Sequence, residues 1–137
     1  MTIVVTSEGH EGLRHRIEVE GFDDLFADGP EFIGGRDSAP DPHDYLDMAL
    51  GACKAITARM YARRKEWPLE GIKVSVARDD SQERHGIYRL QVSMEFLGIE
   101  DAGQRNRLLE IAERCPIQRL MTVSQVEVNT SLTAFSA

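Results

Sequence analysis

The sequence has little that favours nucleic-acid binding, a membrane span or secretion. Its 16 Lys and Arg residues are outnumbered by 23 Asp and Glu residues, and the formal net charge is −7. Such a charge repels nucleic acids and anionic membranes unless a basic patch overcomes it, and the densest basic stretch, residues 59–65, is predicted to be the solvated end of a helix. No run of about 18 apolar residues occurs, and the first residues lack a signal-peptide pattern. We therefore expect a cytoplasmic protein with no nucleic-acid or membrane partner.

Cysteine, histidine and tryptophan are also scarce. The chain has two cysteines, four histidines and one tryptophan. Two cysteines in a reducing compartment are thiols, so a disulfide between them would be transient rather than structural. The histidines lack the close spacing of metal motifs, and the sequence has no phosphate-binding glycine loop and no GxSxG elbow. We therefore expect no bound metal and no bound cofactor, which leaves the two thiols as the candidate chemistry.

The apolar residues that are present predict strands in hairpins and two helices. Alternation with a period of two residues predicts strands at about 2–6, 13–19, 22–26, 71–80, 86–96 and 123–135. Helical patterns occupy residues 42–66 and 101–114, with one further turn at 117–120. Because the strands come in hairpins rather than alternating singly with helices, the predicted fold class is α+β, in a single domain over residues 1–137.

The longer helix is the central element of the predicted fold. Asp41 followed by Pro42 is a typical helix start, with Asp as the cap and Pro in the first turn. At about 1.5 Å per residue the helix would be about 37 Å long, which is more than one chain of this size easily covers. Small residues near its middle allow another backbone to approach, so we expect a central helix packed against its copy in a dimer.

Both cysteines lie in surroundings that suit either a reactive or a buried thiol. Cys53 is in the middle of the long helix, and Cys115 is at the end of the second helix, where Pro116 forces a turn. A free cysteine is often a small buried hydrophobic residue, which is the ordinary alternative here. A reactive thiol needs a nearby cation to stabilise its thiolate, and the candidates are Arg14, Arg16 and Arg36.

Acidic residues gather before and at the start of the long helix. Within a straight helix Asp44 would lie about 13.5 Å from Cys53 and on nearly the opposite face. A carboxylate that supports the thiol would therefore come from the preceding loop or from another chain.

Several motifs follow one another along nearly the whole chain. They are GGRD at 34–37, Pro40 and Pro42, Leu46, ALGAC at 49–53 with Thr57, Cys115-Pro116, and VEVNTSL at 126–132. As an ordered set they resemble the OsmC/Ohr family of osmotically induced and organic-hydroperoxide-resistance proteins. The resemblance implies an OsmC-like fold in an intertwined homodimer, with the long helices at its centre and the active sites at the subunit interface.

The resemblance also implies a chemistry. In the peroxidase members the first cysteine attacks the peroxide O–O bond as a thiolate and becomes a sulfenic acid, and the second cysteine converts it to a disulfide. Cys53 would be the peroxidatic residue and Cys115 the resolving one. The partners implied are a small organic hydroperoxide and an external dithiol reductant of the lipoyl type.

One position departs from the peroxidase pattern. Peroxidase members place a glutamate directly after the loop proline, paired with an arginine from the N-terminal hairpin. Here Pro42 is followed by His43, and the carboxylate comes one residue later as Asp44. Arg14 is the first choice for the arginine, and Arg16 is close behind. The chain is thus nearer to the general OsmC-like branch.

The sequence therefore predicts a catalytic site of Cys53, Cys115, Arg14 and Asp44, with Arg14 stabilising the thiolate and Asp44 orienting Arg14. The predicted function is a thiol-dependent peroxidase for organic hydroperoxides. The alternative is a non-catalytic OsmC-like dimer that uses the same pocket to bind a small apolar ligand or to sense redox state.

Overall fold

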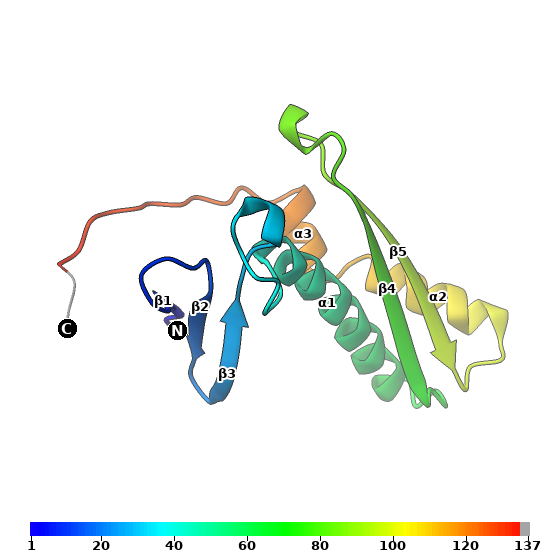
Figure 1. The fold of residues 1–137 in the computed structure, drawn as a ribbon. Helices are drawn as coiled ribbons and strands as arrows, with labels where there is room; N and C mark the ends of the chain where they lie inside the picture. The colour runs from blue at the N-terminus through cyan, green and yellow to red at the C-terminus, as the bar shows by residue number, and fades with distance from the viewer. Residues whose placement is uncertain (135–137) are drawn as a thin grey trace. The chain divides into compact units, whose positions relative to one another are not determined.

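The structure, a computed structural model, describes residues 1–134 and has an α+β fold with antiparallel hairpins and one long helix (Figure 1). This confirms the predicted fold class. The elements are β1 (Val4–Ser7), β2 (His15–Val19), β3 (Phe22–Ala27), η1 (Glu31–Ile33), α1 (Pro42–Arg64), β4 (Gly71–Asp79), η2 (Glu83–His85), β5 (Arg89–Leu97), α2 (Ala102–Ala112) and α3 (Pro116–Thr122). They form two compact units: residues 1–51 with 75–93, and residues 52–74 with the chain from residue 94.

The first unit contains a small antiparallel sheet in the order β1-β2-β3. Val5 pairs with Ile17 across β1 and β2, and Ile17 pairs with Leu25 across β2 and β3. The register shifts between Ile17 and Val19, where the strand carries an irregularity. The N-terminal hairpin and the short third strand predicted from the sequence are confirmed.

Helix α1 begins where the sequence predicts, because Asp41 and Asp44 cap each other. The Asp41 carboxylate accepts from the Asp44 amide at 2.9 Å, and the Asp44 carboxylate accepts from the Asp41 amide at 3.0 Å. This reciprocal arrangement satisfies amide donors that the first turn leaves unpaired. The hydroxyl of Tyr45, the residue after Asp44, donates to the Phe26 carbonyl at 2.5 Å, which connects α1 to β3.

The second hairpin is also confirmed, with β4 and β5 forming a two-stranded sheet. Figure 1 shows the two strands side by side, joined by the segment that carries η2. Half-buried positions alternate with exposed ones along β5, as expected for a sheet with one partly covered face.

The main hydrophobic core lies in the second unit. One face of α1 places Ala58, Tyr61 and Ala62 against Leu108 of α2, and further core residues come from the connections. The rings of Tyr61 and Trp67 meet edge to face with centroids 5.5 Å apart. Helix α2 is capped by Asp101, whose carboxylate accepts from the Gln104 amide at 2.8 Å, so the predicted second helix is confirmed with its cap.

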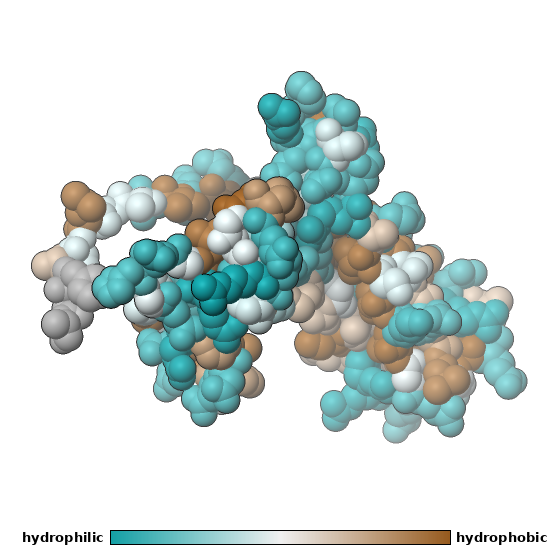
Figure 2. All heavy atoms as spheres, viewed as in Figure 1, coloured by the Kyte–Doolittle hydropathy of each residue, from teal (hydrophilic) through white to brown (hydrophobic). Residues whose placement is uncertain are grey.

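The strand predicted at 123–135 is wrong for the residues that the structure describes. Residues 125–134 are neither helix nor strand, and Phe135 lies outside the described residues. A strand exists only when a neighbour accepts its backbone hydrogen bonds, and no strand in residues 1–134 pairs with this segment. Val126, Val128 and Leu132 are therefore exposed, and Figure 2 shows apolar side chains uncovered along the segment.

None of the helices in residues 1–134 combines the length and the apolar character that crossing a membrane requires.

Candidate active site

The structure brings the two cysteines together within the second unit. Cys53 projects from α1 and is half-buried, whereas Cys115 precedes α3 and is fully buried. Both are free thiols, and they are close enough for Cys53 to raise the pKa of Cys115. Cys115 also caps α3, because its sulfur accepts from the Gln118 amide at 3.4 Å. Residues 62 positions apart in the sequence thus form one dithiol pair.

The surroundings make the two thiols unequal. Burial raises the pKa of the Cys115 thiol, and so does its neighbour Cys53, while the Gln118 amide and the charge of Lys54 act in the opposite direction. Cys115 therefore favours the protonated form more than an ordinary cysteine does. Cys53 is the more exposed of the pair.

Lys54, in the same unit, is a cation that acts to lower the pKa of Cys115, and the sequence did not indicate this role. Its side chain is buried, with 5% exposed. Its ammonium donates to the Ala112 carbonyl at 3.2 Å and to the side-chain oxygen of Gln118. A signal was present in the sequence, because Lys54 is the one charged residue between Met48 and Ala58 and directly follows Cys53.

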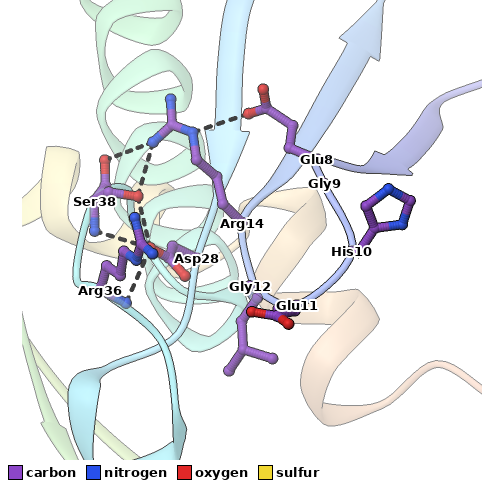
Figure 3. Close-up of a pocket in the computed structure, with 10 residues that line it drawn as sticks. Glu8, Gly9, His10, Glu11, Gly12, Arg14, Asp28, Arg36 and Ser38 are labelled. Carbon is purple, nitrogen blue, oxygen red and sulfur yellow. Dashed lines mark hydrogen bonds and ion pairs between the residues drawn. The ribbon is translucent and has the colours of Figure 1, made fainter.

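Arg14 lies in the first unit, at a pocket of about 630 Å³ (Figure 3). Its guanidinium donates to the Glu8 carboxylate at 2.9 Å and to the hydroxyl and carbonyl oxygens of Ser38 at 2.8 and 3.1 Å. It also lies over the Phe26 ring, 4.1 Å from the centroid. The guanidinium donors of Arg14 are thus directed at oxygen atoms of Glu8 and Ser38.

Asp28 also lines this pocket, and the sequence did not indicate it as a site residue. Its buried carboxylate accepts from the Ser38 hydroxyl at 2.6 Å, the Ser38 amide at 3.1 Å and the Arg36 amide at 3.3 Å. These bonds, led by the one from the Ser38 hydroxyl, lower the pKa of Asp28 from 3.8 to about 2. The GGRD loop, which the sequence marks as a motif, therefore lies against the carboxylate of Asp28, the residue directly after β3 (Figure 3).

Asp44 has a different arginine from the one predicted. Its carboxylate accepts from Arg78 of β4 at 3.0 Å, and the hydrogen bond from the Asp41 amide, followed by Arg78, lowers the pKa of Asp44. Arg14 binds Glu8 and Ser38 instead. The predicted pairing of Asp44 with Arg14 is therefore not made in the described residues, because Asp44 is already engaged by the helix cap and by Arg78.

Arg78 belongs to a second network that the sequence did not indicate. Its guanidinium donates to the buried Asp47 carboxylate at 2.7 Å, and the Tyr88 hydroxyl donates to the other Asp47 oxygen at 2.8 Å. Burial raises the pKa of Tyr88 to about 12, with the Asp47 hydrogen bond in support. His43 at the start of α1 binds the Glu83 carboxylate at 2.9 Å.

The other two candidate arginines also lie in the first unit. The Arg16 guanidinium is 5.8 Å from the Phe26 centroid, and Arg36 contributes its backbone amide to Asp28. Which arginine supports the Cys53 thiolate stays a prediction, as does the supporting carboxylate. Residues 1–134 contain no group of three or more His, Cys, Asp or Glu side chains arranged to hold a metal ion.

Comparison with known proteins gives one family. Residues 35–131 match the family model described as OsmC-like protein. No curated protein sequence matches the chain.

Solved structures with this fold come from several bacteria. A Psychrobacter arcticus 273-4 protein named for osmotic stress induction and detoxification response superposes with a TM-score of 0.73 at 21% identity, covering 87% of this chain and 86% of that one. The Legionella pneumophila organic hydroperoxide resistance protein OsmC gives 0.61 at 20% identity, with 90% of each chain covered. The Bacillus subtilis organic hydroperoxide resistance protein OhrB gives 0.60 at 18% identity, covering 90% of this chain and 92% of that one. These likenesses support the fold of nearly the whole chain.

Proposed function

This chain belongs to the OsmC-like protein family, and from that premise we propose that it is a thiol-dependent peroxidase that reduces organic hydroperoxides. The observation that carries the proposal is that the free thiols of Cys53 and Cys115 are near neighbours, close enough for Cys53 to raise the pKa of Cys115. Solved proteins of the same fold that are named for organic hydroperoxide resistance support this choice of substrate class.

The proposed reaction has three steps. The Cys53 thiolate attacks the terminal oxygen of the hydroperoxide, the O–O bond breaks, and the alkoxide leaves as an alcohol after taking a proton. The Cys115 sulfur then attacks the Cys53 sulfenic acid, which forms the disulfide and releases water. An external dithiol reductant of the lipoyl type reduces the disulfide and becomes a disulfide itself.

The exposure of the two thiols supports these roles. The half-buried Cys53 is open to a dissolved peroxide, and the buried Cys115 is held next to it, where a sulfenic acid would form. Arg14 stays in the proposal as the cation of the thiolate on the family resemblance, and its guanidinium binds Glu8 and Ser38 within the first unit. Asp44 enters it as the residue that fixes the first turn of α1 and holds Arg78.

One stoichiometric experiment tests the proposal. After one equivalent of tert-butyl hydroperoxide per chain, we expect both thiols to disappear together in a labelling assay and to return when dihydrolipoamide is added. With excess of both reagents, hydroperoxide consumption should continue over many equivalents. Two thiols that stay reactive would contradict the proposal, and consumption that stops at one equivalent would favour the redox-sensing alternative.

We also propose that the protein is a homodimer. Helix α1 exposes Met48, Ile56 and Met60 at a spacing of four or eight residues, and the segment after α3 exposes Val126 and Val128 with no neighbouring strand in residues 1–134. Uncovered apolar surface of this kind, next to unpaired backbone, is typical of a chain completed by a partner.

The mass in solution tests the dimer. Light scattering should give twice the chain mass for the wild-type protein, because a second copy covers the apolar residues after α3. The substitution Val128→Asp should lower this mass toward that of one chain. The neighbouring substitution Glu127→Gln, which changes no apolar residue, should not. A wild-type protein with the mass of one chain would rule the dimer out.

A further inference from the structure

Lys54 is a buried cation that lies near Cys115. Its ammonium donates to two neutral oxygens, the Ala112 carbonyl and the Gln118 side chain. No ion pair found in residues 1–134 includes Lys54. A buried charge that has neutral partners alone is costly compared with one that faces an anion. The site therefore favours a negative charge close to Lys54.

The two acceptors of Lys54 lie on either side of Cys115. Ala112 is the last residue of α2, and Gln118 is in the first turn of α3. Gln118 contacts both groups, because its side chain accepts from Lys54 and its amide donates to the Cys115 sulfur. Lys54 thus fixes the turn that carries Cys115 and places its charge beside that sulfur.

The ionisable groups that act on the Cys115 thiol are Cys53 and Lys54, both from α1. From α3 the Gln118 amide donates to the sulfur, and from α2 the Ala112 carbonyl binds Lys54. Of these groups Lys54 is the cation, so its positive charge would stabilise a thiolate at Cys115.

We propose that Lys54 is a positioning residue for Cys115, whose ammonium stabilises the Cys115 thiolate when this sulfur closes the disulfide and when it leaves again on reduction. This inference rests on the proposed function for the order of the thiol steps. The charge of Lys54 would then serve the second thiol in addition to holding the turn.

In closure the Cys115 thiolate bonds to the Cys53 sulfur, and the hydroxide that leaves takes a proton from solvent to become water. In reduction a thiolate of the external dithiol attacks the Cys53 sulfur, and the electron pair of the broken S–S bond goes to the Cys115 sulfur. The second thiol of the reductant then displaces Cys53, and the reductant leaves as a disulfide.

The first test titrates Cys115 without any peroxide. In a Cys53→Ser background Cys115 is the one remaining thiol, and its thiolate is followed by ultraviolet absorbance as a function of pH. Adding Lys54→Gln, which removes the charge but keeps a donor, should raise the pKa of Cys115 by about one unit. The fraction of thiolate at neutral pH should then be about tenfold lower. The exposed Lys73→Gln is the matched control and should leave the titration in place.

The second test follows the two chemical steps separately in the chain with both cysteines. With Lys54→Gln, closure of the disulfide should slow about tenfold more than formation of the sulfenic acid, so that dimedone traps more sulfenic acid than in wild type. If Lys54→Gln does not fold, Lys54→Met keeps the side-chain length without the charge, and Lys54→Arg should restore closure in part.

Coincident titration curves for the Lys54 and Lys73 variants would overturn the proposal, as would equal slowing of both steps. The titration does not depend on peroxide chemistry, so it reads the role of Lys54 even if the protein consumes no hydroperoxide. If the protein were not a peroxidase, the wild-type thiols would stay unreacted after hydroperoxide is added. In the Cys53→Ser background, Lys54→Gln would still raise the pKa of Cys115.

Discussion

Replacing Cys53 with serine is expected to lower the rate of hydroperoxide consumption by at least about 1,000-fold. A serine hydroxyl is not ionised near neutral pH and lacks the polarisable sulfur that attacks the O–O bond, so the first step has no nucleophile. The measurement is consumption of tert-butyl hydroperoxide with dihydrolipoamide as the reductant. Equal rates in the wild-type protein and the variant would remove the basis of the proposed function.

Cys115→Ser is the matched variant, because it removes the other thiol of the same pair. The buried Cys115 acts after the peroxide has reacted, so this variant should still consume about one equivalent of hydroperoxide and should accumulate a sulfenic acid at Cys53. Turnover should then be slow, since no disulfide forms for the dithiol to reduce. A Cys115→Ser chain that loses the first equivalent as well would reverse the two roles.

Local chemistry explains which parts of the fold could be predicted from the sequence. Asp41 with Pro42, and Asp101, mark helix starts through contacts with residues three positions away. The two hairpins follow from alternation on either side of polar turns. The segment 123–135 alternates just as well, but a strand depends on a partner that its own pattern does not contain, and no strand in residues 1–134 supplies one.

The same distinction applies to the candidate site. The motif around Cys53 and the Cys115-Pro116 turn could be recognised in the sequence, and the structure places the two thiols close enough for one to shift the pKa of the other. The partner of Asp44 could not be recognised, because Arg78 lies 34 residues away and its choice of carboxylate depends on how β4 packs on α1. Lys54 was overlooked because its burial depends on α2 and α3, where its partners Ala112 and Gln118 lie 58 and 64 residues further along the chain.

The largest stability effect is expected at Asp47, where Asp47→Ala should lower the free energy of unfolding by about 3 kcal/mol. Its side chain is 11% exposed and accepts from both Arg78 at 2.7 Å and Tyr88 at 2.8 Å. Removing the carboxylate leaves the Arg78 charge, itself one quarter exposed, with Asp44 as its remaining partner and leaves the Tyr88 hydroxyl unpaired. Urea unfolding measures the loss as a lower midpoint at an unchanged slope.

Asp44→Ala is the matched control, because it removes a carboxylate from the same arginine one turn earlier in α1. The Asp44 side chain is 48% exposed, so water replaces much of what it loses, and the expected cost is about 1 kcal/mol for the cap and the surface ion pair together. Asp47→Asn should fall between the two, since it keeps an oxygen acceptor but loses the charge. An Asp47→Ala cost no larger than that of Asp44→Ala would show that the buried Asp47–Arg78–Tyr88 network does not join α1 to the hairpin. The half-buried cap at Asp41 and Asp44 would then be at least as important.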